Sequence, residues 1–245
     1  MGFKTIVTLR ETVKRTDYRV LVSALYDSLF YGLSVAAGFG IMKLIEIQSG
    51  KIPLAGSIDD LSMRAAEQLQ NQFAQFYIYA SLYVIAGFFL LAVFASVFKG
   101  LAWQVMIGQK MTRKQFLQFF KANIAIVIAI MIIGLLVMLL LKQTIVHWYL
   151  ILVMLLSFFI GSSVYFSIAK DAPSTLRNIF SAAFSNVPKM IGPFLLILFC
   201  GLLMVSLLSS VASLEKSYVI IPFLLLYAAL SRLYLITSLQ SQNKH

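Results

Sequence analysis

The sequence predicts an all-α, polytopic membrane protein with six transmembrane helices and with amphipathic helices at the membrane surface. Three observations lead to this fold class: the composition, six long apolar segments, and the uneven distribution of lysine and arginine between the loops. Of the 245 residues, 60% are hydrophobic and only 12% are charged, whereas soluble domains carry about 25% charged residues. We therefore expect one integral membrane domain over residues 1–245.

Six apolar segments have the length that a transmembrane helix needs. Crossing about 30 Å of hydrocarbon takes roughly 20 apolar residues in a helix. The predicted spans are residues 20–42, 73–98, 123–141, 148–169, 191–212 and 218–239. The apolar run of the first span is longer than the roughly 7–15 residues of a signal-peptide core, so we expect this span to be retained.

Lysine and arginine lie mostly in the segments on one side of the predicted membrane. If the N-terminus is cytoplasmic, the inner segments carry 15 of these residues and the outer loops carry 5. The positive-inside rule then predicts a multi-pass protein of the cell membrane with both termini in the cytoplasm. The net charge of +11 would face anionic lipid headgroups, and we do not expect nucleic acid as a partner.

A basic, helical stretch precedes three of the spans. The clearest is Ser174 to Val187, where apolar residues recur on one helical face; the others are Thr112 to Lys121 and Thr5 to Arg19. Pro188 and Pro193 are expected to break the chain between the third stretch and the fifth span. The order of basic helix, span, outer turn and span predicts three helical-hairpin repeats; generic membrane-surface helices without duplication are the alternative.

Four cations on these stretches are candidates for contact with lipid headgroups. They are Arg113, Lys114, Lys121 and Arg177. Cations near the inner membrane surface are attracted to anionic lipids, so the sequence predicts anionic lipid as a binding partner.

Asp27 and Arg232 are predicted to form an ion pair inside the membrane. Each lies seven residues from the inner end of its span, so the two side chains should lie at similar depth. A charge at depth costs several kcal/mol unless it is paired. Two alternatives remain: Arg232 snorkels to the surface while Asp27 faces a polar cleft or is protonated, or the two residues serve transport or a proton relay.

Small residues recur every fourth position along the first span. Ser28, Gly32, Ala36 and Gly40 would form a ridge that lets another helix approach closely. We expect this ridge to pack inside the protein, and homodimerisation is the alternative.

Several functional classes lack their motifs. The only cysteine, Cys200, lies inside the fifth span, so no intrachain disulfide or cysteine metal site is expected. The chain has no Walker-type glycine loop, GxSxG, HExxH or CxxC sequence. We therefore expect no catalytic residues, no metal and no cofactor.

The layout of the basic stretches and hairpins, with residues Arg113 to Phe120 and Arg177 to Phe184 as its best examples, resembles a known type of membrane domain. It is similar to six-span domains of uncharacterised prokaryotic proteins, including the membrane domain attached to some glycerophosphoryl diester phosphodiesterases. The resemblance covers most of the chain, but it rests on layout and has no specific motif. The soluble catalytic domain of those enzymes is absent here, so the resemblance implies no enzymatic activity.

Three classes of function are compatible with these observations. The leading hypothesis is a non-enzymatic membrane protein that organises anionic lipid or a partner membrane protein, with self-association also open. The second is a transporter or permease component with a polar path near Asp27 and Arg232. The third is a lipid-modifying enzyme at the inner surface.

Overall fold

In the computed structural model, all regular secondary structure of the described residues is helical. The structure describes residues 8, 10, 12, 13, 16–50, 52, 63–140, 143–171, 175–211 and 217–242, and among these there is no β-strand. The predicted all-α class is therefore confirmed for this part of the chain.

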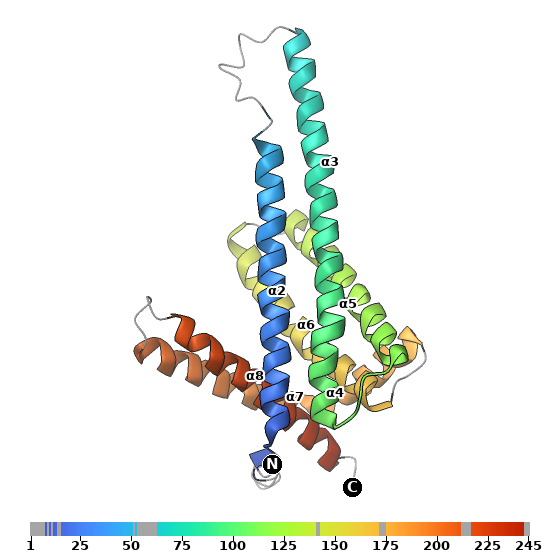
Figure 1. The fold of residues 1–245 in the computed structure, drawn as a ribbon, viewed down its shortest axis with the longest axis vertical. Helices are drawn as coiled ribbons and strands as arrows, with labels where there is room; N and C mark the ends of the chain where they lie inside the picture. The colour runs from blue at the N-terminus through green and yellow to red at the C-terminus, as the bar shows by residue number, and fades with distance from the viewer. Residues whose placement is uncertain are drawn as a thin grey trace. The chain divides into compact units, whose positions relative to one another are not determined.

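Helices account for nearly all of the described chain (Figure 1). In order they are α2 (Tyr18–Ser49), α3 (Met63–Phe94), the π-helix η2 (Ala95–Lys99), α4 (Gly100–Ile107), α5 (Arg113–Leu140), α6 (Gln143–Asp171), α7 (Leu176–Val211) and α8 (Ser217–Gln242). Because α3, η2 and α4 follow one another without a gap, the second predicted span does not end at residue 98. Helical backbone continues to Ile107.

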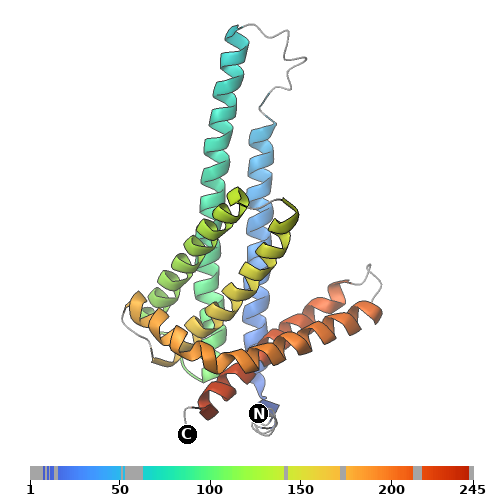
Figure 2. The same cartoon turned by 180° about the vertical axis from the view of Figure 1, so that it is seen from behind.

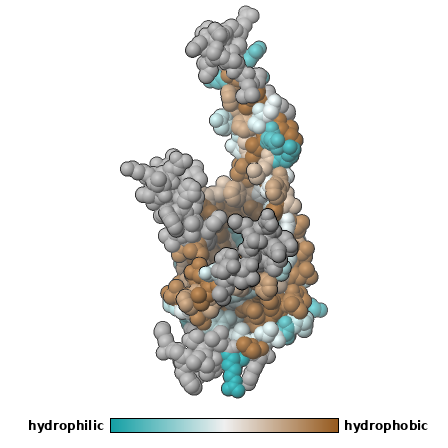
Figure 3. Space-filling view, turned by 90° about the vertical axis from the view of Figure 1, so that its left-hand side faces the viewer, coloured by the Kyte–Doolittle hydropathy of each residue, from teal (hydrophilic) through white to brown (hydrophobic). Residues whose placement is uncertain are grey.

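Five helices in the described residues are long and apolar enough to cross a membrane. They are Tyr18–Ser49, Glu67–Ile107, Arg113–Gly134, Leu176–Met204 and Ile221–Ser241. Figure 3 shows apolar side chains, in brown, over much of the face that it presents. These lengths and compositions fit a multi-pass membrane protein. The fourth predicted span, 148–169, lies within α6, but the side chains of 148–154 lie outside the described residues, and six spans stay a prediction.

Two stretches that were expected as separate surface helices are continuous with the spans that follow them. Helix α5 begins at Arg113 and runs on into the third span, and α7 runs from Leu176 through Pro188 and Pro193. The predicted break at the prolines is therefore wrong. Side chains on both sides of the prolines are buried on one face of α7, including Ile179, Met190 and Ile197, and this packing favours an unbroken helix.

The first basic stretch, 5–19, is described only in part, at residues 8, 10, 12, 13 and 16–19. No contact among the described residues tests whether the three hairpins are repeats, so the repeats stay a prediction.

The chain divides into two compact units. We call Tyr31–Phe94 the hairpin unit and Met1–Phe30 with Ala95–His245 the bundle unit. In the hairpin unit, α3 and the second part of α2 lie side by side (Figures 1 and 2). The side chain of Ile41 occupies the space beside Gly87, and the amide of Gln48 donates a hydrogen bond to the Tyr83 hydroxyl at 3.3 Å.

The small-residue ridge of α2 does not face α3 within the hairpin unit. Gly32, Ala36 and Gly40 are exposed, and a β-carbon at Gly32 or Gly40 would meet no atom within 4 Å. Ser28 donates its hydroxyl to the Ala24 carbonyl of its own helix at 2.9 Å. The expected packing role of the ridge inside the protein is therefore not seen among the described residues.

The bundle unit holds a buried core shared by six helices. Helix α6 packs against α5 and α7, α7 packs against α8, and α4 packs against α6 and α8; Figure 2 shows α7 and α8 as a pair of neighbouring helices. Large side chains that are almost fully buried come from four of these helices: Phe119, Ile168, Ile179, Met190 and Leu239.

A glycine ends α4 and turns the chain toward α5. Gly108 has φ of 83°, in the left-handed region that L side chains avoid. Its N–H and the N–H of Gln109 both donate to the Gln104 carbonyl at 2.9 Å. A β-carbon at residue 108 would also lie 2.9 Å from the guanidinium of Arg19.

We expect Gly108→Ala to lower the free energy of unfolding by about 1–2 kcal/mol, because alanine is strained at positive φ. Thermal unfolding of the detergent-solubilised protein measures the change. The matched control is Gly38→Ala, since Gly38 is exposed in α2 and a β-carbon there meets no atom within 4 Å. An equal loss in both variants would contradict this role of the left-handed turn.

Candidate functional site

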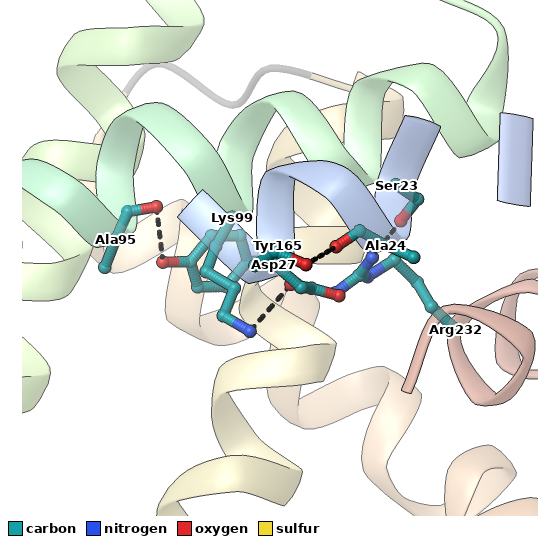
Figure 4. Close-up of polar contacts among 8 residues, drawn as sticks. Ser23, Ala24, Asp27, Ala95, Lys99, Tyr165 and Arg232 are labelled. Atoms are coloured by element: carbon teal, nitrogen blue, oxygen red, sulfur yellow. Dashed lines mark hydrogen bonds and ion pairs between the residues drawn. The ribbon is translucent and has the colours of Figure 1, made fainter. Parts of the chain in front are cut away.

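Three charged side chains from three helical elements meet inside the bundle unit. Asp27 of α2 is fully buried. Its carboxylate accepts hydrogen bonds from Arg232 of α8 at 3.0 Å and from Lys99 of η2 at 2.7 Å. Figure 4 shows the two cations approaching Asp27 from different sides. We call Asp27, Lys99 and Arg232 the ionic cluster.

Aromatic rings and a hydroxyl complete the surroundings of the two cations. The guanidinium carbon of Arg232 lies 5.6 Å from the centre of the Trp103 ring, and Arg232 also donates to the Ser23 hydroxyl. The ammonium of Lys99 lies 4.9 Å from the centre of the Phe30 ring. Cation–π contacts of this length are attractive, and more so where water is excluded.

Local helical geometry explains how these residues reach one another. Ser23 and Asp27 are four residues apart on α2, so they lie on the same face. Lys99 is the last residue of η2. A π-helical turn is rare and occurs mostly as a single turn inside an α-helix, frequently at a functional site.

The same π-helical turn takes part in a second polar network. The Tyr165 hydroxyl of α6 donates to the side-chain oxygen of Asn123 at 2.7 Å and contacts the Ala95 carbonyl at 3.3 Å. The Asn123 amide donates to the Ser96 hydroxyl at 2.9 Å. Ala95 and Ser96 belong to η2, so this short segment makes polar contacts with α5 and α6 as well as with Asp27.

Hydrogen bonds also join α6 to α7. The Ser163 hydroxyl donates to the Ala183 carbonyl at 2.7 Å, and the Asn186 amide donates to the Ser167 hydroxyl at 3.3 Å. Both serines are almost fully buried. Inside a bilayer such contacts matter because lipid offers polar groups no partners.

The predicted pair of Asp27 and Arg232 is thus brought together in the structure, whereas the participation of Lys99 was not predicted. Sequence reasoning placed Lys99 just after the second span, in an inner loop. The signal that it lies inside a longer helix is the apolar run that follows it, Gly100 to Ile107.

The four cations expected at lipid headgroups lie elsewhere. Arg113, Lys114 and Lys121 are exposed on α5, and Arg177 is exposed on α7. None of them joins the ionic cluster. In the part of the chain that the structure describes, no three His, Cys, Asp or Glu side chains gather where they would hold a metal ion.

Comparisons with known proteins give no relative. No protein-family model matches the chain, and neither a curated protein nor a solved structure matches it. The resemblance to the membrane domain of glycerophosphoryl diester phosphodiesterases therefore stays a prediction from layout.

We expect Asp27→Asn to lower the free energy of unfolding by about 3–5 kcal/mol, because the buried Arg232 and the partly buried Lys99 lose the carboxylate that they share. Lys99→Met should cost less, about 1–3 kcal/mol, because Asp27 keeps its contact with Arg232. Denaturant unfolding of the solubilised protein measures both. The control is Asp17→Asn, an exposed carboxylate beside Arg19, where less than about 1 kcal/mol is expected.

A double-mutant cycle tests the direct coupling. The loss in Asp27→Asn combined with Arg232→Met should fall short of the summed single losses by about 1 kcal/mol or more. Strict additivity would show that the two side chains do not interact.

Proposed function

We propose that this protein is a non-enzymatic, multi-pass membrane protein that binds and organises anionic lipid at the inner membrane surface. The observation that carries the proposal is the pair of exposed basic helix starts on α5 and α7. Arg113 and Lys114 are the first two residues of α5, and Arg177 is the second residue of α7. All three side chains are exposed.

The positions of these cations support an anionic partner. Each helix start is capped by a threonine: the Gln115 N–H donates to the Thr112 hydroxyl at 3.2 Å, and the Asn178 N–H donates to the Thr175 hydroxyl at 3.2 Å. A cation in the first turn of a helix is repelled by the positive end of the helix dipole. A phosphate there is attracted by both the cation and the remaining N–H groups.

Apolar side chains beside the cations suit the membrane surface. Leu117 is 44% exposed on α5 and Phe184 is 57% exposed on α7. A helix that continues from exposed cations into an apolar segment places its basic end at headgroup depth. We infer that the apolar side chains enter the acyl region while the cations contact the phosphates.

We expect the triple variant Arg113→Gln, Lys114→Gln, Arg177→Gln to retain fewer anionic lipids, because it removes cations worth about 1 kcal/mol each near an anionic surface. Native mass spectrometry of the gently extracted protein, with phosphatidylglycerol added, counts the bound lipids. The matched control removes three cations from the predicted outer loops, with Lys43→Gln, Lys142→Gln and Lys216→Gln. Equal lipid retention in the two triple variants would refute the proposal, and a co-extracted protein in place of lipid would point to a partner membrane protein.

A second candidate function is transport past the ionic cluster. It is favoured by the third charge, since Lys99 adds an ionisable group beside Asp27. Intramembrane ionisable groups commonly mark ion pathways and proton relays. Gln104 is 1% exposed, and its side-chain amide has no hydrogen-bond partner among the described residues. The interior therefore contains a buried polar group besides those of the ionic cluster.

For the transport candidate, we expect proteoliposomes to conduct protons under a potassium diffusion potential, read with an internal pH dye. Asp27→Asn and Lys99→Met should each abolish this flux, because the relay needs both ionisable groups. The Arg113, Lys114, Arg177 triple variant is the control and should keep it. A wild-type flux equal to that of empty vesicles would exclude proton transport.

A further inference from the structure

A cavity of the bundle unit lies on the same helices that supply the ionic cluster. Its volume is about 290 Å³. It is lined by Val20 of α2, Met106 and Ile107 of α4, and Gln240 of α8, among others. The three charges of the ionic cluster come from α2, from α8 and from η2, the π-helical turn that runs directly into α4. The cavity and the cluster therefore share one set of helices.

Helical spacing places the cavity about two turns away from the ionic cluster. On each of the three helices, a lining residue is seven or eight positions from a member of the cluster: Val20 and Asp27, Lys99 and Met106, Arg232 and Gln240. Residues at this spacing lie on the same helical face, about 10–12 Å apart along the axis. All three offsets run toward the predicted cytoplasmic surface, so the cavity lies between the cluster and that surface.

The accessible surface inside the cavity is mostly polar. The side chains of Arg19 and Asp17 are 42% and 44% exposed, whereas Val20 and Leu233 are only 2% and 6% exposed. A space of this volume holds roughly ten water molecules at about 30 Å³ each. Water therefore suits this cavity better than a hydrocarbon chain does.

Two buried polar side chains beside the cavity have no hydrogen-bond partner among the described residues. They are the Gln104 amide and the Thr237 hydroxyl, and each residue is 1% exposed. Gln104 precedes the lining residue Ile107 by three positions, and Thr237 follows the lining residue Leu233 by four. Each is therefore one turn from the cavity on the same helical face. Buried polar groups that lack a protein partner are commonly bonded to ordered water.

A hydroxyl on α2 continues the polar path from the cavity to the ionic cluster. Ser23 is fully buried and lies three positions after Val20 and four before Asp27. Its hydroxyl accepts a hydrogen bond from Arg232 (Figure 4). Ser23 thus connects the face of α2 that borders the cavity with the charges of the cluster.

We propose that the cavity is a hydrated vestibule through which water from the cytoplasmic side reaches the ionic cluster. Gln104 and Thr237 bind water that enters between α4 and α8. Because hydrogen-bonded water carries protons, the vestibule gives the transport candidate its cytoplasmic entrance. The vestibule does not rest on transport, since its accessibility is measured without any flux.

The test measures how fast single cysteines react with a thiol reagent that does not cross membranes. All variants carry Cys200→Ser, because Cys200 is exposed. The reagent is methanethiosulfonate ethylsulfonate, whose negative charge suits a route on which arginine and lysine outnumber aspartate. Lys110→Cys and Lys43→Cys, at exposed positions on opposite sides of the predicted membrane, show which side of a vesicle the reagent reaches.

Gln104→Cys is the reporter, and Gln118→Cys is its matched control. Gln104 is 1% exposed and Gln118 of α5 is 5% exposed, so static exposure alone favours the control. We expect Gln104→Cys to react about tenfold faster than Gln118→Cys, because the control position opens only through local unfolding. The reaction should occur from the side at which Lys110→Cys reacts. Gln104→Cys removes an amide without a protein partner, so the variant should fold.

Filling the cavity should close the route. Ile107→Trp, added to Gln104→Cys, should slow the reaction about tenfold, toward the rate set by local unfolding. Leu196→Trp, at a half-buried position of α7 that does not line the cavity, should leave it unchanged. If Ile107→Trp does not fold, Ile107→Cys replaces it as a probe of the lining, and it should react at least as fast as Gln104→Cys.

Two outcomes would overturn the proposal. One is equal reaction rates in Gln104→Cys and Gln118→Cys, and the other is reaction of Gln104→Cys only from the side at which Lys43→Cys reacts. These failures differ from those of the proposed functions. Proteoliposomes without proton flux would exclude transport but leave the reaction rates unaffected, and the Arg113, Lys114, Arg177 triple variant should keep them as well.

Discussion

The bundle unit is organised around one constraint, the burial of the Asp27 carboxylate in a chain of which 60% of the residues are hydrophobic. A carboxylate without counter-charges at that depth would be too costly to keep ionised. Arg232 and Lys99 provide the counter-charges at 3.0 and 2.7 Å, and each comes from a different helix. The positions of α2, η2 and α8 are therefore tied to one another by a single side chain.

Hydrogen bonds extend this constraint to the other helices of the bundle unit. Lipid is as apolar as a leucine side chain, so apolar contact alone gives membrane helices little reason to choose one neighbour over another. The bonds from Tyr165 to Asn123 and from Ser163 to the Ala183 carbonyl give α6 defined partners in α5 and α7. Polar contacts thus specify which helices are neighbours, while packing of side chains such as Phe119 and Ile168 fills the space between them.

The sequence predicted the all-α class and the pairing of Asp27 with Arg232, because length, apolarity and equal depth are local properties that can be counted along the chain. It did not predict Lys99, because a π-helical turn has no sequence signature and the apolar run after it was read as a loop. The prediction of a break at Pro188 and Pro193 was wrong. It considered only the local effect of proline on its own helix, whereas the burial of Met190 and Ile197, which favours a continuous helix, depends on the neighbouring helices. The small size of the residues from Ser28 to Gly40 can be read from the sequence, but the sequence does not show which helix, if any, packs against them.

The ionic cluster also sets an order of events during synthesis. Lys99 is 72 residues and Arg232 is 205 residues from Asp27 along the chain. At the usual rate of about 5–20 residues per second, the lysine emerges about 4–14 s after the aspartate, and the arginine about 10–40 s after it. Lys99 is thus the first of the two counter-charges to be synthesised, and the ionic cluster can be complete only when the last helix has been made.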